Sequence, residues 1–156
     1  MISTVVLIHF VSALNYSYIY SNYKIIIPKI NSGGQCVVLM KHMTHTYRML
    51  VDTGSIDTYI DITRTETSKL PWKPLYQLHG SNLIGTQDIL KKCEFRNVMI
   101  GNMEIDKIVV LSIDLTFNNS ARAQHKMEPI DGILGCDVML KTSMVIDMKN
   151  KLIYVK

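Results

Sequence analysis

The sequence has little of what marks several large classes of protein. Its 156 residues include only 3 cysteines, without a Cys-x-x-Cys pair, so a disulfide framework is not expected. Glycine and proline number 8 and 4, which is too few for a low-complexity linker protein. Charged residues make up 19% and form no long run of one sign. The net charge of +4 therefore gives no indication of nucleic-acid binding, and nucleic acid is not expected as a partner.

The thiols and histidines do not suggest a metal centre. Cys36, Cys93 and Cys136 are expected to be reduced and mostly buried, as in an intracellular protein. A zinc site made of Cys36, His42 and His45 is conceivable, but its spacing matches no established ligand pattern. We therefore expect neither a metal ion nor an organic cofactor.

Residues 1–23 form a distinct apolar segment at the start of the chain. The run from Thr4 to Leu14 is interrupted by His9, and it is shorter than the roughly 20 residues that span a bilayer. No Lys or Arg precedes Lys24, so the basic start of a secretory signal is missing. A strand or packing segment is favoured, together with a cytoplasmic location. An atypical signal or a membrane anchor, and with it a secreted or membrane-associated protein, stays open.

The remaining residues, 24–156, are expected to form one domain that is long enough to bury its own core. Apolar residues make up 47% of the chain, and many occur in short β-branched runs separated by turn residues. Strands are predicted at 25–27, 37–40, 93–100, 105–113, 144–148 and 152–155, a polar loop at 116–128, and a short helix at 137–141. This spacing is typical of a small β barrel or sandwich.

The most informative segment is an apolar strand that runs directly into Asp52-Thr53-Gly54-Ser55. The strand would hold the carboxylate of Asp52 rigidly, and the hydroxyl of Thr53 would fix the loop. Gly54 allows a tight turn and a close approach of backbone. Ser55 could donate a hydrogen bond to the carboxylate. By itself the triplet is a weak signal, because Asp and Gly are also ordinary turn residues.

A second motif strengthens the first. Ile133-Leu134-Gly135 begins 81 positions after Asp52 and leads into the predicted helix and a closing hairpin. In this order and at this separation, the two motifs resemble those of the retroviral-type (retropepsin-like) aspartic proteases and their single-domain cellular and bacterial relatives. The resemblance covers nearly all of residues 24–156. It implies an all-β fold, a closed β barrel of the retropepsin-like acid protease type, with one short C-terminal helix.

The resemblance also assigns site residues. It implies Asp52, Thr53 and Gly54 as the catalytic triplet and Ser55 as a neighbouring substrate contact. The strand Ile133-Leu134-Gly135 would lie beside the catalytic loop and help form the floor of the substrate cleft. A flap over the substrate would fall at Gly80-Ser81-Asn82-Leu83-Ile84-Gly85, where the two glycines allow motion. A hairpin turn without a function is the alternative for that segment.

Aspartic proteolysis needs two carboxylates, and the chain offers one such triplet. A second Asp-Thr-Gly or Asp-Ser-Gly is missing, and Asp131-Gly132 lacks the intervening hydroxyl residue. The second Asp52 is therefore expected from a second copy, which predicts a homodimer with the site on its two-fold axis. The expected activity is that of an endopeptidase acting on an extended polypeptide, without cofactor. The alternative is a non-catalytic module of the same fold that dimerises or binds an extended peptide.

Overall fold

A computed structural model describes residues 21–31, 33–67, 70–74 and 91–156. In chain order their elements are β1 (Lys24–Ile26), β2 (Lys29–Ile30), β3 (Cys36–His42), β4 (His45–Val51), β5 (Tyr59–Asp61), α2 (Ile62–Thr67), β6 (Lys73–Pro74), β7 (Lys91–Ile100), β8 (Met103–Ile113), α3 (Thr116–Gln124), β9 (Gly132–Leu134), α4 (Cys136–Lys141), β10 (Val145–Asp147) and β11 (Leu152–Val155). Residues 1–20 of the predicted N-terminal segment 1–23 and the predicted flap at 80–85 lie outside the described residues, so the proposed division at residue 24 stays a prediction.

Most strands belong to one sheet that closes on itself. The order is β2-β3-β4-β9-β5-β8-β7-β6, and an additional pairing of β3 with β7 joins Met40 to Ile100. A barrel of the six strands β3, β4, β9, β5, β8 and β7 results. Because closure leaves these strands without free edges, their backbone groups are paired all the way round. The predicted all-β closed barrel is confirmed.

The core of the barrel comes from the alternation along its strands. In β4 the side chains of Tyr47 and Met49 are buried, whereas Arg48 and Leu50 are only half-buried and lie on the other face. Phe95 from β7 lies between the rings of Tyr47 and Trp72, with ring centres 5.8 and 6.1 Å away. The long β7–β8 hairpin supplies much of the remaining core, and residues 101–102 form its turn between the two predicted strands.

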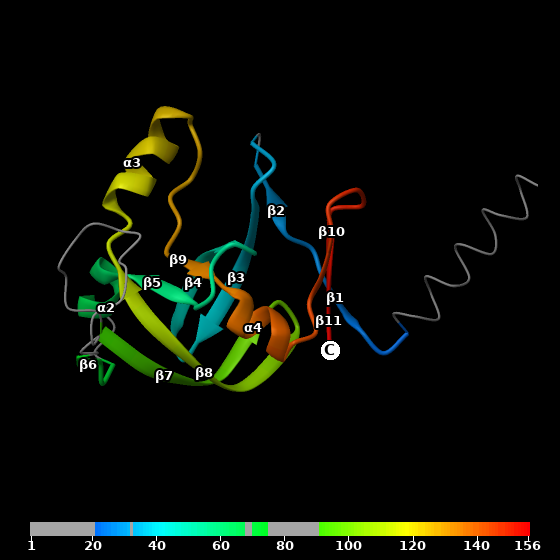
Figure 1. Cartoon of the computed structure of the whole chain (residues 1–156), viewed down its shortest axis with the longest axis horizontal. Helices are drawn as coiled ribbons and strands as arrows, with labels where there is room; N and C mark the ends of the chain where they lie inside the picture. The colour runs from blue at the N-terminus through cyan, green and yellow to red at the C-terminus, as the bar shows by residue number, and fades with distance from the viewer. Residues whose placement is uncertain (1–20, 32, 68–69, 75–90) are drawn as a thin grey trace, which may run out of the picture.

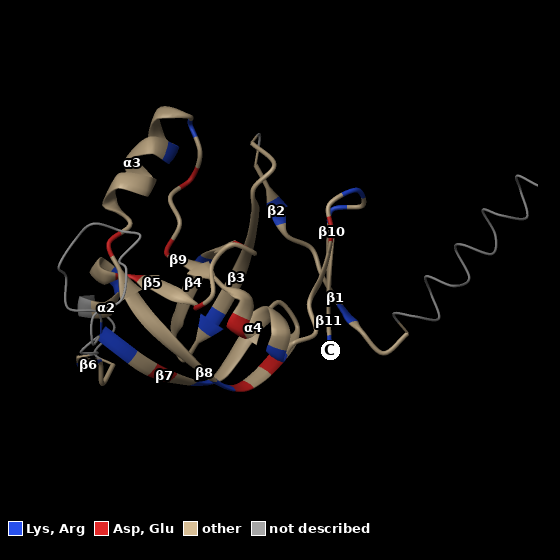
Figure 2. Ribbon diagram, viewed as in Figure 1, with Lys and Arg blue, Asp and Glu red and all other residues tan. Residues whose placement is uncertain are grey.

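A second sheet is formed by β1, β11 and β10, which lie together on one side of the barrel in Figure 1. The predicted final hairpin is thus present, with Ile146 opposite Ile153. Charged residues of both signs are spread along the elements (Figure 2), in agreement with the scattered charges of the sequence. Among the described residues no helix combines the length and apolar character needed to cross a membrane.

The helices differ in part from the prediction. The C-terminal helix is confirmed as α4, but α2 and α3 are present in addition. Residues 116–124, predicted as loop, form α3, which Figure 1 shows apart from α4. This helix has no side-chain cap and no acidic residue in its first turn, so its local signals are weak. It is held instead by the buried side chain of Arg122, which donates to the backbone oxygen of Glu128 and to the side chain of Gln35.

Candidate active site

Asp52 comes directly after β4, where a neighbouring strand holds its backbone. Strand β9 runs parallel to β4, with Val51 opposite Leu134, and it pairs antiparallel with β5 on its other side. The backbone N–H of Asp52 donates to the backbone oxygen of Leu134 at 3.1 Å. The two sequence motifs, 81 positions apart, are thus joined by the sheet. The predicted position of Ile133-Leu134-Gly135 beside the Asp52 loop is confirmed.

The loop after Asp52 is a tight turn built on its own carboxylate. Oδ1 of Asp52 accepts the N–H of Gly54 at 2.9 Å, and the backbone oxygen of Asp52 accepts the N–H of Ser55 at 3.1 Å. Asp52 is half-buried, while Thr53 and Gly54 are exposed. The carboxylate is therefore oriented by the loop and still reachable from solvent.

The expected hydrogen bond from Ser55 to the Asp52 carboxylate is not formed, whereas the contact of Ser55 with substrate stays a prediction. The hydroxyl of Ser55 donates to the backbone oxygen of Asp57 at 2.8 Å and so stabilises the next turn of the loop. The contact to the carboxylate comes from the N–H of Gly54 instead.

Glycines at the start of β9 and directly after its end allow the close approach of this strand to its neighbours. A Cβ atom at Gly135 would lie 2.2 Å from the backbone oxygen of Asp57, and one at Gly132 would lie 2.3 Å from that of Tyr59. Neither position has room for a side chain, because the obstructing atoms are backbone. The sequence therefore needs glycine here for packing.

Three further residues, which the sequence motifs did not indicate, join the loop after Asp52 to the helix α4. The buried hydroxyl of Thr58 accepts the N–H of Gly135 at 3.1 Å and donates to Oδ1 of Asp137 at 2.6 Å. Sγ of Cys136 lies 3.3 Å from the backbone oxygen of Thr53. Asp137 in the first turn of α4 was the available signal, since acidic residues are favoured at a helix start.

Asp131, which is followed directly by Gly132 without a hydroxyl residue between them, makes structural contacts. Its carboxylate accepts the backbone N–H of Arg48 at 2.8 Å and lies 3.3 Å from Nε of Arg64. Its own N–H donates to the backbone oxygen of Arg48. These contacts join β4 to the segment that enters β9, so this carboxylate is engaged away from the Asp52 loop.

No described group of three or more His, Cys, Asp or Glu side chains is positioned to share a metal ion. The conceivable zinc ligands are separated: Cys36 begins β3 and His42 ends it, about 20 Å along an extended strand. His42 stacks on Phe95 in the core, and burial and then the charge of His45 lower the pKa of His42. Burial also raises the pKa of the Cys36 thiol.

Comparison with known proteins agrees with this arrangement. A family model described as aspartyl protease matches residues 33–138. The crystal structure of a retropepsin-like aspartic protease from Rickettsia conorii is similar, with 15% identity, a TM-score of 0.55, and coverage of 85% of this chain and 90% of that one. The retroviral protease-like domain of Ddi1 from Leishmania major has 14% identity, a TM-score of 0.47, and coverage of 77% and 86%.

No curated protein matches the sequence. The family model spans more than half of the chain and includes both Asp52 and Gly135, the residues that the sheet brings together. The retropepsin-like barrel of the Rickettsia protein agrees with the closed barrel described above. This chain belongs to the aspartyl protease family and has the retropepsin-like fold.

Proposed function

We propose that the chain is an aspartic endopeptidase whose active site forms between two copies. The observation that carries the proposal is the Asp52 loop itself: one half-buried, oriented carboxylate at the end of a barrel strand, followed directly by two exposed residues. Asp131 and Asp137 are engaged by other partners. A second Asp52 from a partner subunit supplies the missing carboxylate.

The reaction follows from the pairing of like charges. Two carboxylates in close contact cannot both be ionised, so one keeps a proton. The ionised Asp52 removes a proton from a water molecule, which attacks the scissile carbonyl carbon. The protonated Asp52 of the other copy donates a hydrogen bond to the carbonyl oxygen and transfers its proton there as the tetrahedral intermediate forms. When the carbon–nitrogen bond breaks, the proton taken from water passes to the leaving amine, and a hydroxyl proton of the intermediate returns to the other carboxylate. Thr53 and Gly54 build the loop and the contact between copies, and Ile133, Leu134 and Gly135 support the floor on which an extended polypeptide lies.

The test is the cleavage of an unfolded protein substrate by the wild type and by Asp52→Asn. We expect the variant to lose at least about a thousandfold in kcat/KM, because the carboxylate pair acts as a unit. Measurements from about pH 4 to pH 8 bracket the titration of such a pair. Specific activity should rise with enzyme concentration if the active form is a dimer.

Asp106→Asn is the matched control, since Asp106 is exposed on β8 and far along the chain from the Asp52 loop. It should cleave like the wild type. Equal cleavage by wild type and Asp52→Asn would contradict the assignment of Asp52. A wild type that cleaves no substrate would favour the non-catalytic, peptide-binding alternative.

A further inference from the structure

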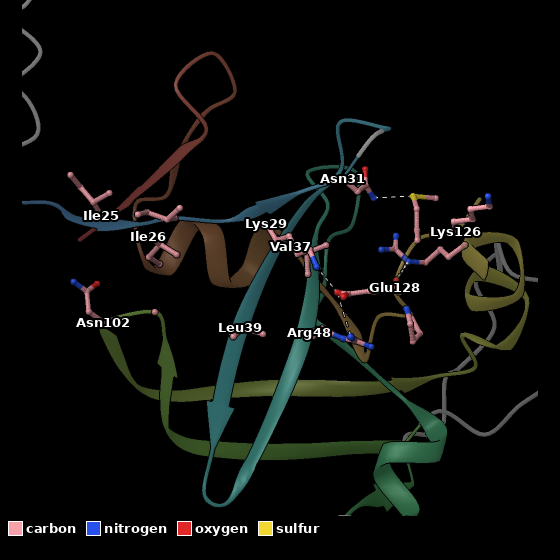
Figure 3. A pocket seen from close by; sticks show the side chains of 15 residues that line it. Ile25, Ile26, Lys29, Asn31, Val37, Leu39, Arg48, Asn102, Lys126 and Glu128 are labelled. Carbon is pink, nitrogen blue, oxygen red and sulfur yellow. Dashed lines mark hydrogen bonds and ion pairs between the residues drawn. The ribbon is translucent and has the colours of Figure 1, made fainter. Parts of the chain in front are cut away.

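A groove of about 900 Å³ lies on the outer side of β3, away from the core. Figure 3 shows its two walls: the segment of β1 and β2 on one side and the loop that follows α3 on the other. Asp52 is not part of its lining. The groove is therefore a feature in addition to the catalytic loop, and its composition indicates what it binds.

One end of the groove is strongly cationic. Lys29, Arg48, Arg122 and Lys126 line it, together with a single carboxylate, that of Glu128. The carboxylate of Glu128 forms ion pairs with Lys29 at 2.8 Å and with Arg48 at 3.6 Å. Both contacts are drawn in Figure 3. Within the described part of the chain, no ion pair is found for Lys126 or Arg122. Arg48 also lies 4.0 Å from the carboxylate of Asp131, outside the lining, so the four cations have two acids within reach and an excess of positive charge remains.

Arg122 is the least ordinary of these cations, because only 7% of it is exposed. Its Nε donates to the backbone oxygen of Glu128 at 2.8 Å and its Nη1 to Oε1 of Gln35 at 2.6 Å, and both acceptors are neutral. Burial and then the charge of Arg48 lower the pKa of Arg122, whereas an ion pair with a carboxylate would raise it. A buried cation without an anion is costly, so an incoming carboxylate would relieve the cost.

The other end of the groove is apolar and unusually exposed. The solvent-exposed fractions of its side chains are 51% for Ile25, 82% for Ile27 and 52% for Leu39. A molecule that fills the whole groove must therefore offer an acidic group at one end and apolar groups at the other. The chain has no Asp or Glu before Asp52, so its own N-terminal segment cannot supply the acid.

The groove lies beside the strand that leads to the catalytic residue. Arg48, which lines the groove, alternates with the buried Tyr47 and Met49 and so lies on the outer face of β4. Asp52 follows directly after the end of β4, four positions along the chain from Arg48, so the backbones of the two residues are at most about 14 Å apart. A substrate strand that lies over Asp52 and extends towards the groove covers that distance with about four residues.

We propose that this groove binds an acidic stretch of an extended polypeptide substrate, with an Asp or Glu about four residues from the scissile bond and apolar residues beside it. The inference rests on the proposed function, because it places the acid relative to the bond that Asp52 cleaves. In a symmetric dimer each copy contributes one groove, so an acid is recognised on either side of the scissile bond.

The test separates binding from cleavage. Asp52→Asn is titrated with two fluorescent peptides of about twelve residues that differ only in Glu or Gln at the fourth position from the cleavage site. Anisotropy should show the Glu peptide binding about tenfold more tightly, as expected for a charge-assisted hydrogen bond to a partly buried cation. With the wild type, kcat/KM should show the same preference.

Two variants should move this preference in opposite directions. Lys126→Gln should weaken the binding of the Glu peptide roughly threefold. Glu128→Gln should strengthen it, because Lys29 and Arg48 lose their competing acid. Lys151→Gln is the matched control: Lys151 is also exposed and also has a positive φ, 57° against 55° for Lys126. It should change nothing.

The outcomes distinguish the two proposals. Preferential binding of the Glu peptide without any Asp52-dependent cleavage would support the groove and contradict the endopeptidase. Asp52-dependent cleavage with equal binding and cleavage of both peptides would overturn the groove assignment alone. Displacement of a bound Gln or Glu peptide by laurate, with no preference between the peptides, would also overturn it, since the groove would then be a fatty-acid site.

Discussion

At the scale of single residues, the hydroxyl of Thr58 links the two halves of the candidate site. It accepts from Gly135 after β9 and donates to Asp137 at the start of α4, and it is fully buried. Buried polar groups cost little only while they keep such partners. The position of the Asp52 carboxylate therefore depends on side chains and backbone groups that have no part in the proposed chemistry.

The buried ring of His42 lacks one hydrogen-bond partner among the described residues, and from its pKa we expect an effect of pH on stability. Its ring is buried against Phe95, and its Nδ1 has no hydrogen-bond partner among the described residues. Because burial and then the charge of His45 lower its pKa, the unfolded chain binds a proton more readily than the folded one below about pH 6.5. The free energy of unfolding should therefore decrease as the pH falls from 6.5 towards 5.

His42→Phe should reduce this acid-dependent loss, because phenylalanine keeps the stacking and has no proton to gain. It should also stabilise the protein by about 1 kcal/mol at pH 7, since it removes an unsatisfied buried nitrogen. Thermal unfolding at pH 7 and pH 5 measures both effects. His125→Gln, at an exposed position after α3, should behave like the wild type. An unchanged difference between the two pH values in His42→Phe would contradict the assignment.

At the scale of elements, β9 decides the geometry of the site. It is only 3 residues long, and it lies between β4, to which it is parallel, and β5, to which it is antiparallel. Such a short strand can occupy this place because glycines stand at its start and directly after its end. The contacts that hold Asp52 are therefore tertiary, and they depend on the absence of side chains at these two positions.

Gly135→Ala should destabilise the protein by about 2–3 kcal/mol, because the new Cβ would overlap the backbone oxygen of Asp57 and the loop would have to move. The same movement should lower Asp52-dependent cleavage. Gly33→Ala is the control, since its Cβ would meet only the side-chain oxygen of Asn31 at 3.5 Å. It should change the free energy of unfolding by less than about 0.5 kcal/mol. Chemical denaturation compares the two; equal effects would exclude a special constraint at Gly135.

At the scale of the whole molecule, the proposed dimer joins the two halves of the active site. Each barrel presents one Asp52 loop with exposed Thr53 and Gly54, and Ile56 beside them is 79% exposed. An apolar side chain that is so exposed next to the candidate catalytic carboxylate is suited to a surface that another molecule covers. The groove proposed above includes Arg48 of the strand that leads to Asp52, so a single extended peptide could contact both.

Dimerisation predicts that thermal stability depends on protein concentration. A partner that binds only the folded chain shifts Tm upwards by mass action, so Tm should rise as the concentration is raised through the dissociation constant. Light scattering at the same concentrations should show the mass of two chains. A single-chain mass together with full Asp52-dependent activity at every concentration would exclude the dimeric site.

The sequence by itself determined the local features: the turn at Asp52-Thr53-Gly54, the strands with alternating or β-branched patterns, and the helix after Gly135. These depend on residues close together in the chain, where periodicity and turn chemistry are informative. The resemblance of the two motifs to a family was enough to predict the closed barrel. It also predicted that Ile133-Leu134-Gly135 lies beside Asp52.

Only the tertiary structure decided how distant residues contribute. The helix α3 has few local end signals, namely Asp114, which accepts the N–H of Thr116, and the basic Arg122 in its last turn. It depends on Arg122 reaching Gln35, 87 positions away, and its segment was therefore predicted as a loop. The hydroxyl of Ser55 donates to the backbone oxygen of Asp57, and the carboxylate of Asp52 accepts the backbone N–H of Gly54. The cationic groove joins β1, β2, β3, β4 and the loop after α3. No local pattern carries such information, because it exists only once the barrel has closed.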